Sequence, residues 1–209
     1  MEKGLHVENS AEFEVVTWER AYDMLLRQAE KIRQSNFKPE VIVGIAKGGW
    51  VPARVLSDLL EISVLATVQV EFYMGIVKSR SEPVLKQKVA AVVTGKKALL
   101  VDDIADTGRS LQLARAHVLQ QGATEVRIAT LYKKPESAVK PDYYEAETSL
   151  WVIFPWETKE TIRKIVEKHR EKTAVEVEIV KLVKAGLPKQ LIERFLKETQ
   201  AERESAKVH

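Results

Sequence analysis

Hydrophobic positions recur along the chain at distinct spacings, and each spacing predicts a different element. Apolar residues at helical spacing between Trp18 and Ile32 predict an amphipathic helix with Thr17 as its N-cap. Unbroken apolar runs at 41–45 and 99–101 are typical of strands that are buried on both faces of a parallel sheet. The alternating run 62–72 predicts a further strand.

Two of the apolar runs lead through a short loop into a helical pattern. The run 41–45 is followed by a glycine-bearing loop and a helix over 53–60, and the run 99–101 by an acidic loop and a helix over 110–121. Another apolar strand follows at 126–132. Strands that alternate with helices predict an α/β fold with a central, mostly parallel sheet flanked by helices.

Beyond residue 157 the pattern predicts only helices, over 158–170, over 174–185 and from Pro188 onward. The last two are separated by Gly-Leu-Pro and can be interpreted as a helix-turn-helix, although a packing or oligomerisation appendage is the preferred interpretation. We therefore predict one domain over 1–157, with a core at about 38–135 and a small hood at 136–157 that includes the N-terminal segment. The helical extension is 158–209.

Composition narrows the classes of function. The chain has 209 residues, 45% of them hydrophobic, which is enough for one good core. It has no cysteine, which excludes disulfides, thiolate catalysis and cysteine metal sites. No apolar stretch is long enough for a membrane span and the first ten residues lack a signal-peptide core, so we expect a soluble, cytoplasmic protein.

The net charge of +3 arises entirely beyond residue 156, where 13 Lys and Arg face 10 Asp and Glu. These charges are interleaved in sign, which favours a solvated helical surface over a nucleic-acid patch.

Three of the six aspartates lie within five positions, as Asp102, Asp103 and Asp106, at the end of a predicted strand. The segment 107–110, Thr-Gly-Arg-Ser, opens the next helix and suits a phosphate, because a helix N-terminus offers free N–H groups. Carboxylates repel phosphate, so the acids are expected to accept hydrogen bonds from ribose hydroxyls, with or without hydrated Mg²⁺. The alternatives are that these residues only cap the helix, or that the acids form the metal cluster of a phosphatase or receiver domain.

A second loop brings a cation to the end of a strand. Lys47, Gly48 and Gly49 follow the run 41–45 and combine a positive charge with two permissive backbone positions, which suits an anion. A tight turn is the alternative. The stretch 73–88 is polar and contains Pro83, and its lack of periodicity predicts either disorder or a lid.

The segment 98–110 resembles the PRPP-binding motif of type I phosphoribosyltransferases: four hydrophobic residues, two acids and a small phosphate loop. The resemblance implies that Asp102 and Asp103 bind the ribose and Mg²⁺, directly or through water, and that Asp106 is the catalytic base. It also implies a 5′-phosphate site made of Ala105, Asp106, Thr107, Gly108, Arg109 and Ser110. Aspartate at position 106 and the Asp-Asp pair are similar to the 6-oxopurine enzymes, and within them to the xanthine-guanine branch.

The same resemblance assigns the remaining subsites. Lys47 and Gly48 would bind pyrophosphate, with a cis peptide between them, and Arg80 of the 73–88 loop would join them when that loop closes. Lys86 and Lys88 are the other candidate cations there. The purine would be bound by Lys134 at its O6, by stacking on Trp151 and by the backbone of Val152. A surface lysine and a core aromatic residue are the respective alternatives, and Trp156 is assigned to packing.

The predicted function is transfer of the phosphoribosyl group from PRPP to guanine, xanthine or hypoxanthine, giving GMP, XMP or IMP and pyrophosphate. The resemblance implies Mg²⁺ as cofactor and a role in purine salvage, and we expect a homo-oligomer. The sequence does not discriminate among the three bases. The alternative is a regulator that senses PRPP or nucleotides and uses its C-terminal helices for nucleic acid or oligomerisation.

Overall fold

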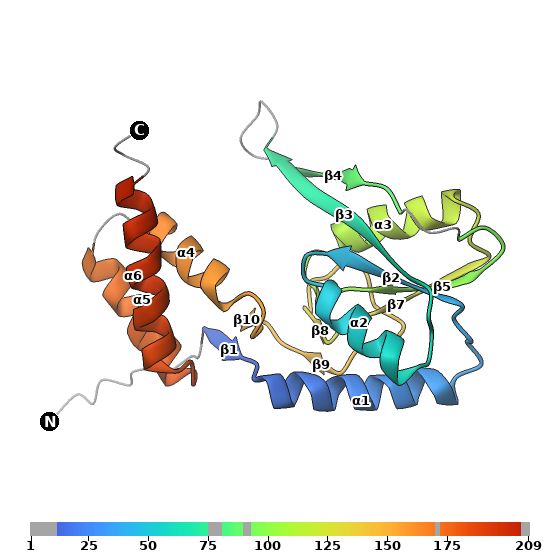
Figure 1. Cartoon of the computed structure of the whole chain (residues 1–209), viewed down its shortest axis with the longest axis horizontal. Helices are drawn as coiled ribbons and strands as arrows, with labels where there is room; N and C mark the ends of the chain where they lie inside the picture. The colour runs from blue at the N-terminus through green and yellow to red at the C-terminus, as the bar shows by residue number, and fades with distance from the viewer. Residues whose placement is uncertain (1–11, 75–80, 90–92, 170–171, 206–209) are drawn as a thin grey trace, which may run out of the picture. The chain divides into compact units, whose positions relative to one another are not determined.

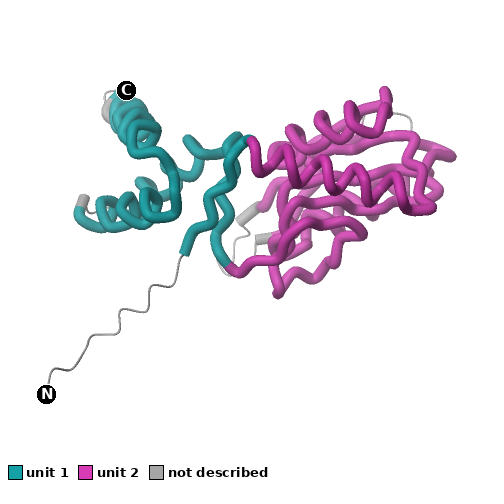
Figure 2. The backbone as a smooth tube through the Cα atoms, turned by 90° about the horizontal axis from the view of Figure 1, so that it is seen from below, with its two compact units in different colours: residues 1–18, 150–209 teal, residues 19–149 magenta. Residues whose placement is uncertain are grey.

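The computed structural model describes residues 12–74, 81–89, 93–169 and 172–205. It divides into two compact units, which are coloured separately in Figure 2. The larger unit is 19–149, and the smaller unit combines 1–18 with 150–209. Each unit is described by itself below. The predicted boundary at residue 157 remains a prediction about which segments fold independently.

The larger unit is built on a five-stranded sheet with the order β4-β3-β2-β5-β7 (Figure 1). Three of its neighbouring pairs are parallel, and only β3 and β4 run antiparallel. The strands are β2 (Val41–Ala46), β3 (Leu65–Met74), β4 (Ser81–Gln87), β5 (Lys97–Val101) and β7 (Glu125–Ala129). The prediction of a mostly parallel central sheet is confirmed.

Strand β2 is buried along its whole length because helices cover both faces of the sheet. Val43 belongs to the core cluster that includes Leu111 and Val118 of α3 (Arg109–Gln120). Its neighbour Gly44 faces the other way, where a Cβ would lie 3.0 Å from the Cβ of Ala53 in α2 (Trp50–Leu59). Successive residues of a strand point to opposite faces, so unbroken apolar runs suit this strand.

A smaller parallel sheet lies beyond the carboxyl end of β5, with the order β6-β8-β9. Its strands are β6 (Ile104–Ala105), β8 (Tyr132–Lys133) and β9 (Ala146–Glu147). The predicted strand 126–132 is therefore two strands in two sheets, because the chain leaves the main sheet at Thr130 and Leu131. Helix α1 (Trp18–Gln34) contacts this region through Gln28, whose amide donates to the Thr130 carbonyl at 2.7 Å.

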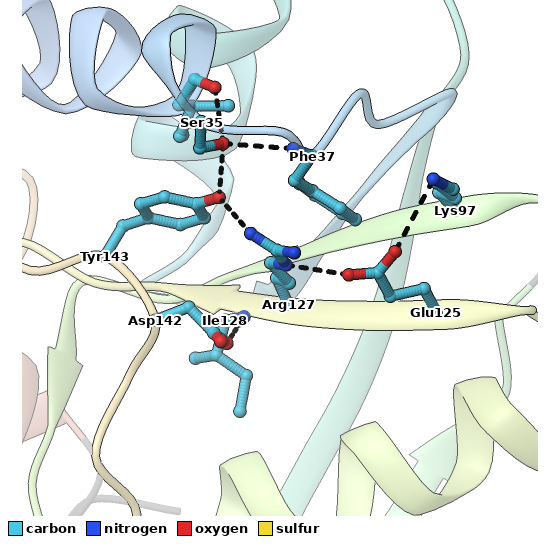
Figure 3. A network of polar contacts seen from close by, with 9 residues as sticks. Ser35, Phe37, Lys97, Glu125, Arg127, Ile128, Asp142 and Tyr143 are labelled. Atoms are coloured by element: carbon cyan, nitrogen blue, oxygen red, sulfur yellow. Dashed lines mark hydrogen bonds and ion pairs between the residues drawn. The ribbon is translucent and has the colours of Figure 1, made fainter.

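A polar network fixes the chain after β7 to the end of α1 (Figure 3). The Tyr143 hydroxyl lies 2.8 Å from the Ser35 hydroxyl and accepts a hydrogen bond from Arg127 at 3.1 Å. Arg127 also bonds Glu125 at 2.8 Å and lies over the ring of Phe37 at 4.7 Å. Partly buried polar groups with several partners favour one arrangement, so this network positions the loop that leads away from the sheet.

The smaller unit joins both ends of the described chain. Strands β1 (Phe13–Val15) and β10 (Trp151–Ile153) pair in parallel and pack on three helices. These helices are α4 (Thr158–Lys168), α5 (Lys172–Lys184) and α6 (Lys189–Ser205), so the predicted helical extension is present. Their shared core is formed by Phe13, Ile153, Ile162, Ile165, Leu182, Leu187 and Ile192. Among the described residues, no helix combines the length and hydropathy needed to cross a membrane.

One predicted loop contains a strand. The pattern of 73–88 predicts disorder or a lid, but β3 extends to Met74 and β4 covers Ser81–Gln87. Strand β4 forms an edge of the sheet, where Pro83 and charged residues are tolerated because one side of the strand has no neighbour to pair with. In the described part of 73–88, the segment predicted to be a lid therefore belongs to the antiparallel β3–β4 pair at the edge of the sheet. Residues 75–80 lie outside the described structure.

Candidate active site

The acidic pair lies at the carboxyl end of β5 and is fixed by main-chain bonds to the end of β7. The Asp102 N–H donates to the Ala129 carbonyl at 3.1 Å, and the Asp103 carbonyl accepts from the N–H groups of Leu131 and Tyr132 at 3.0 and 3.1 Å. The Asp103 side chain is only 6% exposed. Main-chain bonds between two adjacent strands thus hold the acidic pair at the carboxyl ends of these strands. In open α/β sheets, ligands usually bind at this position.

The glycine loop after β2 lies directly against the acidic pair. A Cβ on Gly48 would lie 2.4 to 2.6 Å from the Asp103 carboxyl group, and one on Gly49 would lie 2.2 Å from the Val101 carbonyl. Only glycine allows two loops to approach this closely. The structure therefore brings Gly48 and Asp103 together, as expected for two parts of one site. The cis peptide lies between Ala46 and Lys47, one residue before the expected bond, directly where β2 ends.

The phosphate-loop candidates form the turn between β6 and α3. Gly108 is the N-cap of α3 and has φ of 80°, which a side chain would oppose, and a Cβ there would lie 2.7 Å from the backbone nitrogen of Val139. The Arg109 N–H lies 3.4 Å from the Thr107 hydroxyl. First-turn N–H groups with a glycine cap form the kind of anion site that the sequence predicts.

These residues surround a cleft of about 380 Å³. Its lining comprises Phe72, Asp102, Asp103, Ile104, Asp106, Thr107, Gly108, Arg109, Ser110 and Leu111. Asp106 is exposed and Ala105 is buried beneath the loop. Seven of the eight residues predicted for the ribose and 5′-phosphate therefore line one cleft, and the eighth, Ala105, lies under it.

Two residues near this cleft were not identified from the sequence. The Arg109 guanidinium bonds the Glu82 carboxylate of β4 at 2.8 Å and lies 5.9 Å from the centre of the Phe72 ring. Phe72 is 46% exposed, near the end of the strand beside β2. An aromatic residue at the end of an alternating strand was the available signal. The sequence gives no signal for Glu82, because the pattern of 73–88 predicts disorder or a lid and no strand.

The cations proposed for pyrophosphate differ in their surroundings. Lys47 is exposed at the glycine loop, and its carbonyl accepts from the Trp50 N–H at 3.1 Å. Arg80 lies outside the described residues. Lys86 forms a 3.7 Å ion pair with Glu71 across the β3–β4 pair.

Lys134 is buried rather than a plain surface lysine, with 7% of its surface exposed. Its N–H donates to the Ala105 carbonyl at 2.9 Å, beside the parallel β6–β8 pair. The neighbouring Lys133 ammonium donates to the Lys134 carbonyl at 2.9 Å and pairs with Glu147 at 3.2 Å. The backbone at Lys134 is therefore held on both sides next to the acidic loop.

The other two purine candidates belong to the smaller unit. Trp151 is 41% exposed on β10, with its ring centre 6.0 Å from that of Phe13, and Val152 is buried. Trp156 stacks on Phe154 at 4.9 Å and contacts Trp18 at 5.7 Å, as expected for a packing residue. Within this unit Trp151 thus has an exposed aromatic ring, whereas the ring of Trp156 packs against Phe154 and Trp18.

The acids fit a hydrated Mg²⁺ better than a metal enclosed by protein. Among the described residues, no three His, Cys, Asp or Glu side chains converge as a metal-binding group. Mg²⁺ usually keeps several waters and is held by one or two carboxylates together with substrate phosphates. Asp102 and Asp103 supply that number of carboxylates at the cleft.

A family model for the phosphoribosyl transferase domain matches residues 14–163. The chain belongs to this family. Its fold is the type I phosphoribosyltransferase fold, with three helices that follow the last strand. The matched region ends within α4, so most of the C-terminal helical segment lies beyond the family model.

Named relatives of this phosphoribosyltransferase come from bacteria and an archaeon. A xanthine-guanine phosphoribosyltransferase of Nitratidesulfovibrio vulgaris is 31% identical over 147 residues, which cover 69% of this chain and 84% of that protein. A purine phosphoribosyltransferase of Pyrococcus horikoshii superposes with a TM-score of 0.64 at 36% identity, covering 69% and 93% of the two chains. A Neisseria gonorrhoeae protein with bound ppGpp has the same TM-score at 26% identity, covering 71% and 90%.

Proposed function

We propose that this protein transfers the 5-phosphoribosyl group from PRPP to a 6-oxopurine base, giving a purine nucleoside 5′-monophosphate and pyrophosphate in purine salvage. The observation that supports this best is the contact between two loops: Gly48 lies against the Asp103 carboxyl group, beside a cleft that ends at a helix N-terminus. That arrangement suits a ligand with phosphate at both ends and a ribose between. The relatives from Nitratidesulfovibrio and Pyrococcus, named for purine phosphoribosyl transfer, support the same substrate class.

The residues of the cleft and of the glycine loop then take separate roles. Asp102 and Asp103 accept hydrogen bonds from the ribose hydroxyls, and the N–H groups at the start of α3 bind the 5′-phosphate. Lys47 and the Gly48 amide bind the departing pyrophosphate and stabilise its charge as the C1′–O bond breaks. Bound Mg²⁺, held through Asp102 and Asp103, would neutralise part of the charge on the leaving group. Positioning is expected to supply most of the rate increase.

Asp106 is the proposed general base. As N9 of the purine bonds to C1′, the Asp106 carboxylate accepts the proton from N7, so the base reacts as its more nucleophilic form. Lys134 donates to O6, and Trp151 stacks on the ring. The transition state has oxocarbenium character, as in glycoside cleavage, and requires no covalent nucleophile.

Pyrophosphate release tests the proposed reaction. The purified chain is incubated with PRPP and Mg²⁺ and with guanine, xanthine, hypoxanthine or adenine separately. We expect pyrophosphate and the matching monophosphate with at least one 6-oxopurine and none with adenine. Absence of release with every base, while PRPP still protects the protein from thermal unfolding, would refute the catalytic role.

The role of Asp106 has its own test. Asp106→Asn removes the proton acceptor and should lower kcat by about 10²-fold to 10⁴-fold. Asp58→Asn is the matched control, because Asp58 is 72% exposed on α2 in a weak 3.7 Å pair with Arg54. Unchanged turnover in Asp106→Asn would show that another group accepts the proton.

A nucleotide-sensing regulator is the second candidate, favoured by the Neisseria relative with bound ppGpp. For this chain it predicts that guanine nucleotides raise the unfolding temperature without any turnover of PRPP. It also predicts retention on nucleic acid that weakens steeply as salt rises. Turnover with a purine base and no retention would reject it. Assembly as a homo-oligomer stays a prediction from the sequence.

A further inference from the structure

Helix α5 is apolar on two opposite faces. Its inner face contributes Leu182 and Ile179 to the core of the smaller unit. Its outer face presents Val177, Val180 and Val183, which are 56%, 54% and 40% exposed. A surface helix usually carries polar or charged residues opposite the face that packs on the core, so the outer valines point to a partner that covers them.

The charges around the outer valines are arranged symmetrically about Val180. Glu176 lies four residues before it and Lys184 four residues after it, so both lie on the same face of the helix. Lys181, by contrast, turns inward and pairs with Glu12 at 2.7 Å and Glu178 at 3.1 Å. Within the part of the chain that the structure describes, Glu176 and Lys184 form no ion pair.

We propose that the outer face of α5, formed by Glu176, Val177, Val180, Val183 and Lys184, binds the same face of a second copy of this chain, with the two helices antiparallel. With a two-fold axis beside Val180, Glu176 of each copy lies opposite Lys184 of the other copy. The valines of the two helices then pack against one another between these two ion pairs. A parallel pair would bring like charges level with each other, which is unfavourable. The face is therefore complementary to itself in one orientation.

The size of this face determines the affinity that we expect for the dimer. Helix α5 has 13 residues and is about 20 Å long. Three valines alone cover less than the roughly 800 Å² per partner of a typical stable interface. We therefore expect a dimer that forms and dissociates with concentration in the micromolar range, and not an obligate one.

Single cysteines test the orientation, because the chain has no cysteine of its own. Val180→Cys places one thiol beside the proposed axis, where two copies can form a disulfide. Thr173→Cys lies on the same face seven residues away, so in an antiparallel pair its two thiols are about 21 Å apart along the helix axes, well beyond the roughly 7 Å limit for Cα atoms in a disulfide.

Mild oxidation at micromolar protein should give a covalent dimer with Val180→Cys and none with Thr173→Cys. Dimers from both variants would show a parallel pair, and dimers from neither would show that this face is not an interface. Either result overturns the proposal. The reduced proteins serve as controls for folding by circular dichroism.

A charge exchange tests the pairing without any cross-link. Glu176→Lys or Lys184→Glu alone opposes like charges across the axis and should weaken dimerisation on the order of fivefold. The double variant restores opposite charges and should recover the dissociation constant in sedimentation equilibrium. Glu193→Lys, an exposed residue of α6 paired with Lys189, is the matched control and should change nothing. Failure of the double variant to recover would overturn the proposed register.

Discussion

At the scale of single residues, contact rather than backbone conformation explains the glycine at position 48. Among the described residues Gly48 is not one of the glycines with positive φ, so a side chain would be permitted by the backbone itself. The Asp103 carboxyl group leaves no space for one. The two loops come from different parts of the sequence, and they can approach this closely only because residue 48 has no side chain.

Gly48→Ala should impair turnover while leaving the fold intact. The new Cβ would push the loop from Asp103, and a displacement of about 1 Å can lower activity on the order of 10²-fold. Steady-state kinetics with PRPP measure this. Gly95→Ala is the contrasting variant: Gly95 has φ of 76° and open space around it, so the change should lower stability and not kcat. Full activity of Gly48→Ala would contradict the packing argument.

The site residues that could be predicted are those that follow one another in the chain. The acidic pair, the phosphate loop and the glycine loop each form a short run with a physical meaning of its own. Phe72 and Glu82 could not be found in this way, because their relation to Arg109 depends on how β3 and β4 pair. Trp151 and Val152 were assigned by resemblance, and their role remains a prediction.

At the scale of elements, strand β4 and the residues just after it make two contacts that link the sheet edge to α3. At one end, Glu82 pairs with Arg109 in the first turn of the helix. Beyond the other end, the N–H of Val89 donates to Nε2 of His117 at 3.2 Å. Strand β4 is also one of the elements that the hydrophobic pattern does not predict, because an edge strand with Pro83 and two charged residues resembles a loop in sequence. Buried strands such as β2 were predicted because both faces demand apolar residues.

The Glu82 pair should compete with phosphate for Arg109. Glu82→Gln removes the charge at the 2.8 Å contact and should lower KM for PRPP roughly two- to fivefold, in line with the modest strength of exposed ion pairs. The matched control is Glu30→Gln, an exposed acid of α1 that forms a 2.9 Å pair with Arg33, a residue that has no assigned role in the site. A raised KM would instead mean that Glu82 orients Arg109 for binding.

His117 should make stability depend on pH. Its burial, together with the nearby Lys88 charge, lowers the pKa of His117 below its ordinary value of 6.5. Below about pH 6.5, His117 therefore binds a proton more readily in the unfolded chain than in the folded one. The free energy of unfolding falls as pH drops below about 6.5, and it levels off below the pKa of His117 in the folded state. Thermal unfolding from pH 8 to pH 5 should show this fall. His117→Gln should flatten it, and a parallel pH profile in that variant would exclude His117 as the cause.

At the scale of the whole molecule, the smaller unit depends on both ends of the described chain. Phe13 precedes the larger unit in sequence, whereas Leu182, Leu187 and Ile192 follow it, and all four are buried in one core. The helical pattern beyond residue 157 predicted the helices but not the strand that completes their core. The sequence predicts one hood from the N-terminal segment and 136–157, but the parallel pairing of β1 with β10 and the packing of both strands on α4–α6 are seen only in the structure.

Ending the chain at Glu157 should therefore destabilise what remains. Removing α4–α6 would expose Phe13 and Ile153, which are buried, at a cost of about 3 to 6 kcal/mol for two large apolar side chains. Urea unfolding followed by tryptophan fluorescence measures the effect on Trp151 and Trp156. An unchanged midpoint would show that the helices add nothing to the stability of β1 and β10.

The segment that follows β8 is fastened to the acidic loop at two points. The N–H of Lys134 bonds the Ala105 carbonyl, and the N–H of Ala138 bonds the Thr107 carbonyl at 3.1 Å. A chimera that took 102–110 from a relative with a loop of different length, and kept 134–138 from this chain, would lose these main-chain bonds. In recombination or directed evolution, segments 102–110 and 134–138 should therefore be taken from the same parent.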